Sequence, residues 1–216
     1  MTNSRIARFL ITSVVALVVL IVPWYYLSPY LAAPVVTAAG ELMQFTFSWV
    51  KGYERHGTVG TLVTSLYVFV PQNGRLIMAD MAPEVNYRTY GYGLALLWAL
   101  LIASRAQRMA YKMALGTLIL VPSQAISMCF RWLREALLTA GADVWQQTGL
   151  PRWTAEVIAY GYQFGFLMLT PLVPVLLWLV LDRAFAPVPL PDSPPSKAAL
   201  QTPGPTPATA TPEPAA

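Results

Sequence analysis

Cysteine and histidine are the residue types best suited to nucleophilic catalysis or metal binding, and this chain of 216 residues has one of each. Cys129 could act as a nucleophile only if a base or a cation stabilised its thiolate. Arg131 and Arg134 follow it closely, whereas His56 lies in a distant segment. A single cysteine allows no internal disulfide, and a single histidine argues against a histidine-rich metal site. We therefore predict no metal and no cofactor, and interpret Cys129 as a small buried side chain.

Two glutamines lie in apolar stretches, where a polar side chain needs a partner. Gln124 follows closely on Pro122, and Gln163 lies between Gly161 and Gly165. Proline frees a helix carbonyl, amide side chains can hydrogen-bond across helices, and small residues four apart allow two helices to approach closely. We interpret these five residues as helix-packing or partner contacts. A small transporter subunit acting through the two glutamines is the alternative, although transporters usually carry ionisable residues within their spans.

The other ionisable side chains form no catalytic pattern. Most acidic residues lie near basic ones in polar segments, as in charge-balanced solvated loops. The sequence contains no glycine-rich phosphate loop, no zincin helix and no serine nucleophile elbow. The net charge is +4, but the basic residues are scattered, so binding of nucleic acid is not indicated. We therefore predict that the protein is not an enzyme and has no catalytic residues.

The composition indicates which solvent surrounds these residues. Hydrophobic residues make up 56% of the chain and charged residues only 11%, whereas a soluble domain usually carries about 25% charged residues. The apolar residues form long runs, and a helix of about 20 residues crosses the hydrocarbon core of a bilayer. The sequence predicts a mainly α-helical integral membrane protein with about four transmembrane helices, near residues 9–30, 87–104, 113–130 and 157–181.

The first apolar run has two interpretations. It follows Arg5 and Arg8 and ends in an aromatic cluster at residues 23–26, of the kind found at membrane interfaces. Residues 31–33 resemble the cleavage site of a signal peptide, but the run is long for one and Pro34 disfavours cleavage. We favour an uncleaved membrane anchor, and cleavage is the alternative.

The segments between the first two spans are expected outside the membrane. Residues 35–49 are amphipathic and too short to span, which predicts a helix lying on the membrane surface. Residues 51–57 are charged and contain glycine, as in a loop. Residues 58–70 favour a strand, and residues 71–74 contain the Asn-Gly pair typical of hairpin turns. Residues 75–81 would form the returning strand. We therefore predict a small extracytoplasmic β-hairpin over about residues 58–82.

The remaining segments determine the expected topology. Residues 187–216 are rich in Pro, Ala and Thr and lack large apolar side chains, which predicts a disordered tail. Four spans place both termini on one side, and the short basic loop around Arg105, Arg108 and Lys112 lies on that side. Because short loops dense in Lys and Arg stay in the cytoplasm, we expect a multi-pass inner-membrane protein with both termini cytoplasmic.

Several non-catalytic motifs resemble those of a known family. They are residues 23–27 with 31–34, residues 85–87 running into 90–96, and the break at residues 122–124. In these motifs, and over about residues 5–183, the chain resembles the exosortase H-associated membrane proteins of a bacterial protein-sorting system. The resemblance implies an accessory role beside an exosortase, a polytopic membrane cysteine protease or transpeptidase that recognises C-terminal sorting signals on exported proteins. The enzyme's Cys, Arg and His triad is not carried over to this chain.

These observations favour a non-enzymatic accessory protein that binds or positions an exosortase-type protease or its exported substrates. Its expected partners are that protease, by resemblance, and the lipid bilayer. Gly161 and Gly165 could allow close packing of helices within the chain, with a partner or in a homo-oligomer, and the sequence does not distinguish these three possibilities. A membrane-embedded cysteine enzyme using Cys129 and the small transporter subunit are the alternatives.

Overall fold

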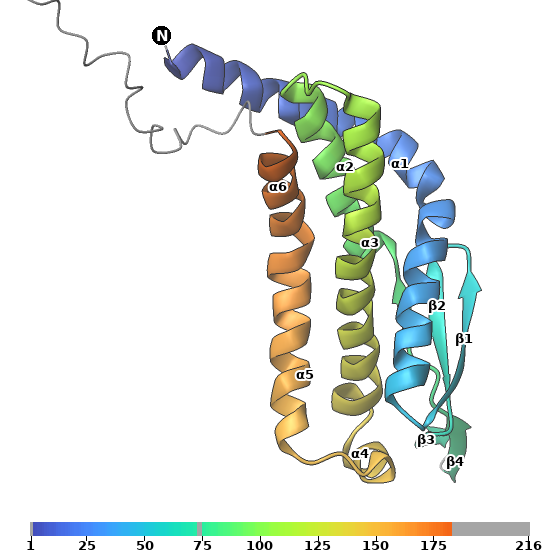
Figure 1. Ribbon diagram of the computed structural model, residues 1–216. Coiled ribbons are helices and arrows are strands. Elements are labelled where there is room, and N and C mark those ends of the chain that lie inside the picture. The colour runs from blue at the N-terminus through green and yellow to red at the C-terminus, as the bar shows by residue number, and fades with distance from the viewer. Residues whose placement is uncertain (1, 73–74, 183–216) are drawn as a thin grey trace, which may run out of the picture. The chain divides into compact units, whose positions relative to one another are not determined.

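Helices make up most of the structure. The computed structural model describes residues 2–72 and 75–182, and Figure 1 shows how their helices and strands are arranged. In chain order the helical elements are α1 (Thr2–Thr46), α2 (Arg88–Ala103), α3 (Met109–Leu133), the π-helical η1 (Arg134–Thr139), α4 (Ala142–Thr148), α5 (Trp153–Gln163), the π-helical η2 (Phe164–Leu169) and α6 (Thr170–Leu181). The predicted mainly helical architecture is confirmed. The tail at residues 187–216, expected to be disordered, lies outside the described residues.

Within the described residues, three helical stretches are long and apolar enough to cross a membrane, namely Ile6–Thr46, Met109–Thr139 and Trp153–Leu181. Helix α2 is apolar but has only 16 residues. It contacts α1, α3 and α6, and much of its surface is buried. A Cβ added at Gly93 of α2 would lie 2.6 Å from Thr170 O, so α2 and α6 approach closely there.

Charged residues mark the two ends of the apolar part of α3. Lys112 Nζ lies 3.1 Å from Asp182 Oδ1, an ion pair that ties the start of α3 to the residue after α6. The next charged residue along α3 is Arg131. Residues 113–130 between them are about 27 Å long at 1.5 Å per residue, close to the roughly 30 Å of a hydrocarbon core. Residues beyond Arg131 on α3 and η1 therefore extend past that thickness.

Two small antiparallel sheets form between α1 and α2. Strand β1 (Val50–His56) pairs with β2 (Val59–Thr64), and β2 pairs with β5 (Glu84–Asn86). Strands β3 (Tyr67–Gln72) and β4 (Arg75–Asp80) form a separate two-stranded sheet. Strands β1 and β2 contact α1, and β5 contacts α3. The three-stranded sheet is thus attached to the helices.

The predicted hairpin is present as β3 and β4, but its surroundings differ from expectation. Residues 58–70, expected as one strand, divide into β2 and β3. The chain changes sheets at Ser65, whose N–H donates to Trp49 O, while the N–H of Met81 donates to Leu66 O. Residues 51–57, expected as a charged loop, mostly form β1. Since β1 is an edge strand with many exposed side chains, its polar composition is compatible with the sheet.

Helix α1 corrects the prediction that a surface helix follows Pro34. The helix continues through Pro23, Pro29 and Pro34 without interruption, and Figure 1 shows its N-terminal part running obliquely to the other long helices. Residues 35–46, expected on the membrane surface, are the last turns of α1. Their apolar face, including Met43, is buried in the main core with residues of α3 and the sheet. Burial of this face offsets the backbone hydrogen bond that each proline removes.

Side chains satisfy the carbonyl groups around Pro29. Because Pro29 has no N–H, Tyr25 O lacks its usual donor, and Ser28 Oγ donates to this oxygen over 2.7 Å. Arg88 Nε donates to Ser28 Oγ over 3.0 Å, and the guanidinium carbon lies 3.7 Å from the centre of the Tyr25 ring. Arg55 Nη1 donates to Pro29 O over 3.1 Å. Groups from α2 and β1 therefore hold this part of α1.

Candidate functional site

The small residues of α5 and η2 face α3. A Cβ added at Gly161 would overlap the ring of Phe130, and one at Gly165 would lie 3.2 Å from Ser127 Oγ. A larger residue at position 161 would therefore push α5 away from α3. The structure places this small-xxx-small pair at a contact within the chain.

A cluster of hydroxyl groups surrounds the carbonyl of Gly165. Ser127 Oγ lies within hydrogen-bonding distance of Ser123 O and Gly165 O, at 3.0 and 3.4 Å. Thr170 Oγ1 donates to Gly165 O over 3.0 Å. Gly165 belongs to the π-helical η2, and side-chain hydroxyls commonly satisfy backbone groups that an irregular membrane helix leaves free. This polar group is therefore satisfied inside the bundle.

The two glutamines interpreted as helix-packing or partner contacts are placed differently. Gln124 is buried on α3, close to Pro122 within a continuous helix. Gln163 is exposed at the end of α5. The described residues contain no hydrogen bond between the two amides. The hydroxyls of Ser127 and Thr170 provide the polar contacts at this depth.

Cys129 lies in the core where α3 meets α1. Its side chain is buried, and Sγ donates a weak hydrogen bond to Ala39 O over 3.5 Å. His56 is exposed on β1, and in the described ranges no contact joins it to Cys129. Residues 2–72 and 75–182 also contain no group of three or more His, Cys, Asp and Glu side chains that could hold a metal ion. The geometry fits a small buried side chain.

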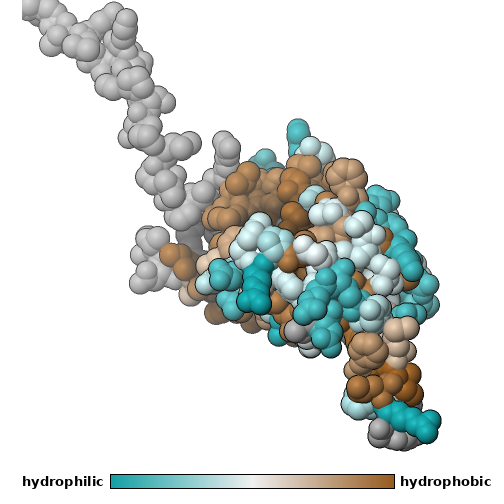
Figure 2. All heavy atoms as spheres, turned by 90° about the horizontal axis from the view of Figure 1, so that it is seen from below, coloured by the Kyte–Doolittle hydropathy of each residue, from teal (hydrophilic) through white to brown (hydrophobic). Residues whose placement is uncertain are grey.

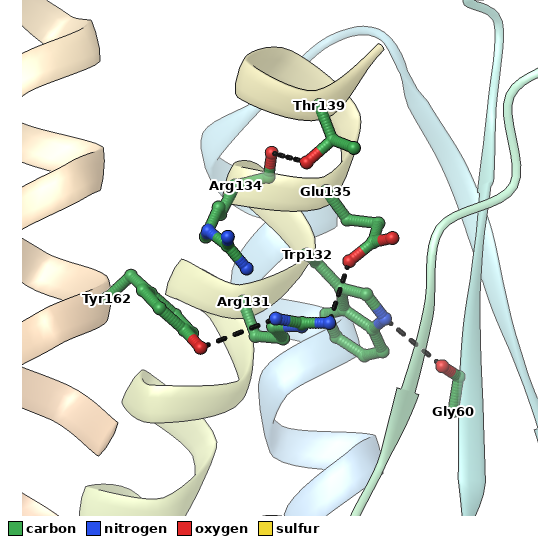
Figure 3. Close-up of polar contacts among 7 residues, drawn as sticks. All are labelled: Gly60, Arg131, Trp132, Arg134, Glu135, Thr139 and Tyr162. Carbon is green, nitrogen blue, oxygen red and sulfur yellow. Dashed lines mark hydrogen bonds and ion pairs between the residues drawn. The ribbon is translucent and has the colours of Figure 1, made fainter. Parts of the chain in front are cut away.

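The C-terminal end of α3 carries a cluster of arginines beside aromatic rings, part of which is drawn in Figure 3. Arg131 Nη2 lies 3.0 Å from Glu135 Oε2, and Nη1 donates to the Tyr162 hydroxyl over 3.4 Å. The Arg134 guanidinium carbon lies 4.5 Å from the centre of the Tyr162 ring, and that of Arg131 lies 5.6 Å from it. Tyr162 of α5 is thus held by two cations from α3 and η1.

Further rings connect this cluster to α2. The Tyr162 ring stacks on Phe166 with centroids 6.1 Å apart, and Phe166 meets the edge of Tyr90 at 6.1 Å. Among the described residues, Glu135 pairs with Arg131, and Arg134 has no ion pair. The cluster can therefore hold the C-terminal end of α3 against the C-terminal part of α5, and it presents one cation without an ion pair among the described residues.

Trp132 couples the same end of α3 to the three-stranded sheet. Its Nε1 donates to Gly60 O over 3.1 Å, as Figure 3 shows. A Cβ added at Gly60 would lie 2.7 Å from Met128 Cε and 3.0 Å from Trp132 Cζ2. A larger residue at position 60 would therefore require Met128 to shift and would crowd the Trp132 ring. The sheet and the arginine cluster are thus both attached to the C-terminal end of α3.

The hairpin is attached at its base to α4. Gln147 Nε2 donates to Tyr67 O over 2.9 Å, and Gln147 Oε1 accepts from Tyr67 N over 3.1 Å. The Gln147 amide therefore bonds the first residue of β3 as a neighbouring strand would. A shallow hollow beside this contact is lined by Tyr67, Phe69, Asp143, Gln146 and Gln147.

The arginine cluster and the contact of Gln147 with Tyr67 were not predicted from the sequence. Arg131 and Glu135 are spaced i, i+4, which is a readable signal for an ion pair on a helix. Their contact with Tyr162 depends on how α5 packs and has no local signal. The contact of Gln147 with Tyr67 joins residues 80 positions apart, so only the tertiary structure shows it.

The chain was also compared with known proteins. The family model described as exosortase H-associated membrane protein matches residues 3–185. The comparison with curated proteins gives no match, and the comparison with solved structures gives none either.

Proposed function

The chain belongs to the family of exosortase H-associated membrane proteins, and from this membership we propose that it is a non-enzymatic accessory protein of the bacterial inner membrane. Its role is to bind or position an exosortase-type sorting protease or the exported substrates of that protease. The observation that carries the proposal is the extent of the family match, which includes every described residue except Thr2. The association named by the family is therefore assigned to this helical domain and its sheets.

The geometry supports a role in binding. The polar groups within the bundle, at Pro29 and at Gly165, are used to hold the chain's own helices. Cys129 faces a carbonyl of α1, which disfavours the alternative of a cysteine enzyme. The hairpin and the hollow between it and α4 are the features that we propose for contact with a partner.

We further propose that α2 is a fourth crossing, with both termini in the cytoplasm. Figure 1 shows the end of α2, the start of α3 and the end of α6 at the same end of the bundle. Helix α2 is only about 24 Å long at 1.5 Å per residue. Because α1, α3 and α6 enclose it, a helix shorter than the hydrocarbon core can still act as a membrane crossing. The hairpin and α4 then lie on the extracytoplasmic side.

Alkaline phosphatase fused after residue 80 would be active in this topology, and a fusion after residue 106 would be inactive. The reverse pattern would overturn it.

The accessory function is tested by co-purification from native membranes in mild detergent. The full chain with an affinity tag is expected to retain an exosortase, and a matched tagged membrane protein of similar size serves as the control. Cys129→Ala in the same cells is expected to leave protein sorting unchanged. Failure to recover an exosortase in several detergents would contradict the binding role, and loss of sorting in a stably folded Cys129→Ala variant would favour the enzyme.

A further inference from the structure

The β3–β4 hairpin exposes an unusual amount of apolar surface. Cross-strand partners share a face of a sheet, so Tyr67, Phe69, Pro71, Leu76, Met78 and Asp80 lie on one face of the hairpin. Leu76 is 71% exposed and Met78 is 64% exposed, and the two rings are also exposed. Figure 2 shows a protrusion with brown, hydrophobic side chains beside teal ones, next to a region of mostly teal and white side chains.

In the topology proposed above, with residues 113–130 of α3 in the hydrocarbon core, the hairpin lies outside that core. The apolar part of α3 ends at Arg131, and the chain continues through η1 to α4 before it reaches Gln147. Gln147 holds the base of the hairpin through both backbone groups of Tyr67. The exposed apolar face is therefore presented to water, where such surfaces usually mark an interface with another protein.

The two edges of the hairpin differ in how many backbone groups are free to form hydrogen bonds. The backbone groups of Tyr67 point away from β4, because they bond Gln147, and alternation places those of Phe69 and Pro71 on the same outer edge. Pro71 has no N–H and Tyr67 is already bonded, so this edge is largely blocked.

The opposite edge is open. The same register directs the backbone groups of Leu76 and Met78 outward on β4. In the part of the chain that is described, neither residue makes a backbone hydrogen bond outside the hairpin. One edge of this sheet is thus protected, while the other has free donors and acceptors beside exposed apolar side chains. This combination is typical of a site to which a peptide adds as a further strand.

The charge at the base of the hairpin indicates the kind of strand that fits. Asp80 is exposed at the end of β4 on the apolar face, and Asp143 lines the hollow beside Tyr67. The ion pairs of the described residues involve neither carboxylate. An apolar strand with a basic residue near this end would match both the surface and the charge.

We propose that the open edge of β4 binds an extended apolar segment of a partner polypeptide, and that a basic residue of this segment lies near Asp80. The inference rests on the proposed accessory function and assigns it a surface. A second copy of the chain fits less well. In an antiparallel β4–β4 pair, outward residues meet outward residues, and Arg75 belongs to the inward set. The basic residue of one copy therefore cannot stand directly opposite Asp80 of the other.

The test uses fluorescent peptides of alternating valine and threonine, one ending in two lysines and its counterpart ending in two glutamates. Binding to the full chain in detergent micelles is followed by fluorescence anisotropy, with empty micelles as a blank. The lysine peptide is expected to bind more tightly than the glutamate peptide by about threefold or more. Met78→Pro removes an outward N–H without touching the β3–β4 hydrogen bonds, and is expected to weaken binding about tenfold. Met78→Val keeps the N–H and an apolar side chain, and is expected to bind like the original chain.

Equal binding by the chain, its Met78→Pro variant and the empty micelles would overturn the proposal, as would tighter binding of the glutamate peptide. A photoreactive amino acid at position 76, irradiated with the lysine peptide present, is expected to give a fluorescent adduct. A crosslinked pair of chains, or lipid adducts alone, would assign the edge to a second copy or to the bilayer and would also overturn it.

Recovery of an exosortase with the Met78→Pro variant separates the strand-addition proposal from the proposed accessory function. If the variant and the original chain both retain the exosortase but no peptide binds, only the strand-addition proposal fails.

Discussion

In the helical bundle, the carbonyl groups left free near Pro29 and Gly165 accept hydrogen bonds from Ser28 and Thr170 of the same chain. In the hairpin, by contrast, Leu76 and Met78 keep their outward backbone groups open and their side chains exposed. In hydrocarbon no water can donate to a freed carbonyl, so a membrane-spanning bundle must supply the donor from its own side chains. In the topology proposed above, the hairpin lies outside the hydrocarbon, where water can solvate an open edge until a partner replaces it. The comparison separates residues that hold the structure from residues that remain available for binding.

Replacing Gly161 with leucine should have the largest effect on the bundle side of this comparison. The new side chain would overlap the Phe130 ring and force α5 away from α3. We expect a loss of about 1–3 kcal/mol in the free energy of unfolding, as for overpacked cores. Thermal unfolding in detergent measures it. The neighbouring Tyr160→Leu is the control, because Tyr160 is exposed. Equal stability of the two variants would show that α3 and α5 are not packed as described.

The Arg88→Ala variant should have the next largest effect. It removes the hydrogen bond to Ser28 Oγ and the contact with the Tyr25 ring that support the proline-containing part of α1. A charge-assisted hydrogen bond and a cation–π contact together suggest a loss of about 2 kcal/mol. Arg75→Ala in the exposed hairpin should leave the unfolding temperature unchanged. If both variants melted at the original temperature, α1 would need another source of support.

The arginine cluster should give a smaller and more specific effect. Arg134→Ala loses its contact with the Tyr162 ring and is expected to lower the free energy of unfolding by about 0.5–1 kcal/mol. In a Tyr162→Leu background the same substitution should have almost no effect, because its partner is absent. A double-mutant cycle on detergent-solubilised protein measures this coupling. Additive losses would mean that Arg134 acts through another contact.

Much of the bundle was predictable because long apolar runs and their flanking charges are local signals. All four predicted ranges fall on helices, and the Asn-Gly pair correctly indicated the β3–β4 pairing. The prediction at Pro34 was wrong because local propensity favours a break, whereas the buried face around Met43 keeps α1 continuous. Strand β1 was missed because an edge strand can be charged and contain glycine.

The candidate sites depended more strongly on tertiary structure. The small-xxx-small spacing identified Gly161 and Gly165, but only packing showed that α3 occupies them. That Gln124 is buried and Gln163 is exposed was not indicated by the sequence, since spacing along each helix does not give the rotation of one helix against another. The protected and open edges of the hairpin depend on Gln147, which is distant in sequence from Tyr67.

Leu76→Ser should have the smallest effect on stability and therefore gives the sharpest test of the comparison. Leu76 is largely exposed and packs in neither core cluster, so we expect the free energy of unfolding to change by less than about 0.5 kcal/mol, as for most surface positions. Leu62→Ser is the matched control on β2, because Leu62 is fully buried and its loss should cost about 2–5 kcal/mol. Thermal unfolding of both variants in the same detergent measures the difference. A large loss of stability for Leu76→Ser would mean that the hairpin face already packs on the chain itself and is not available to a partner.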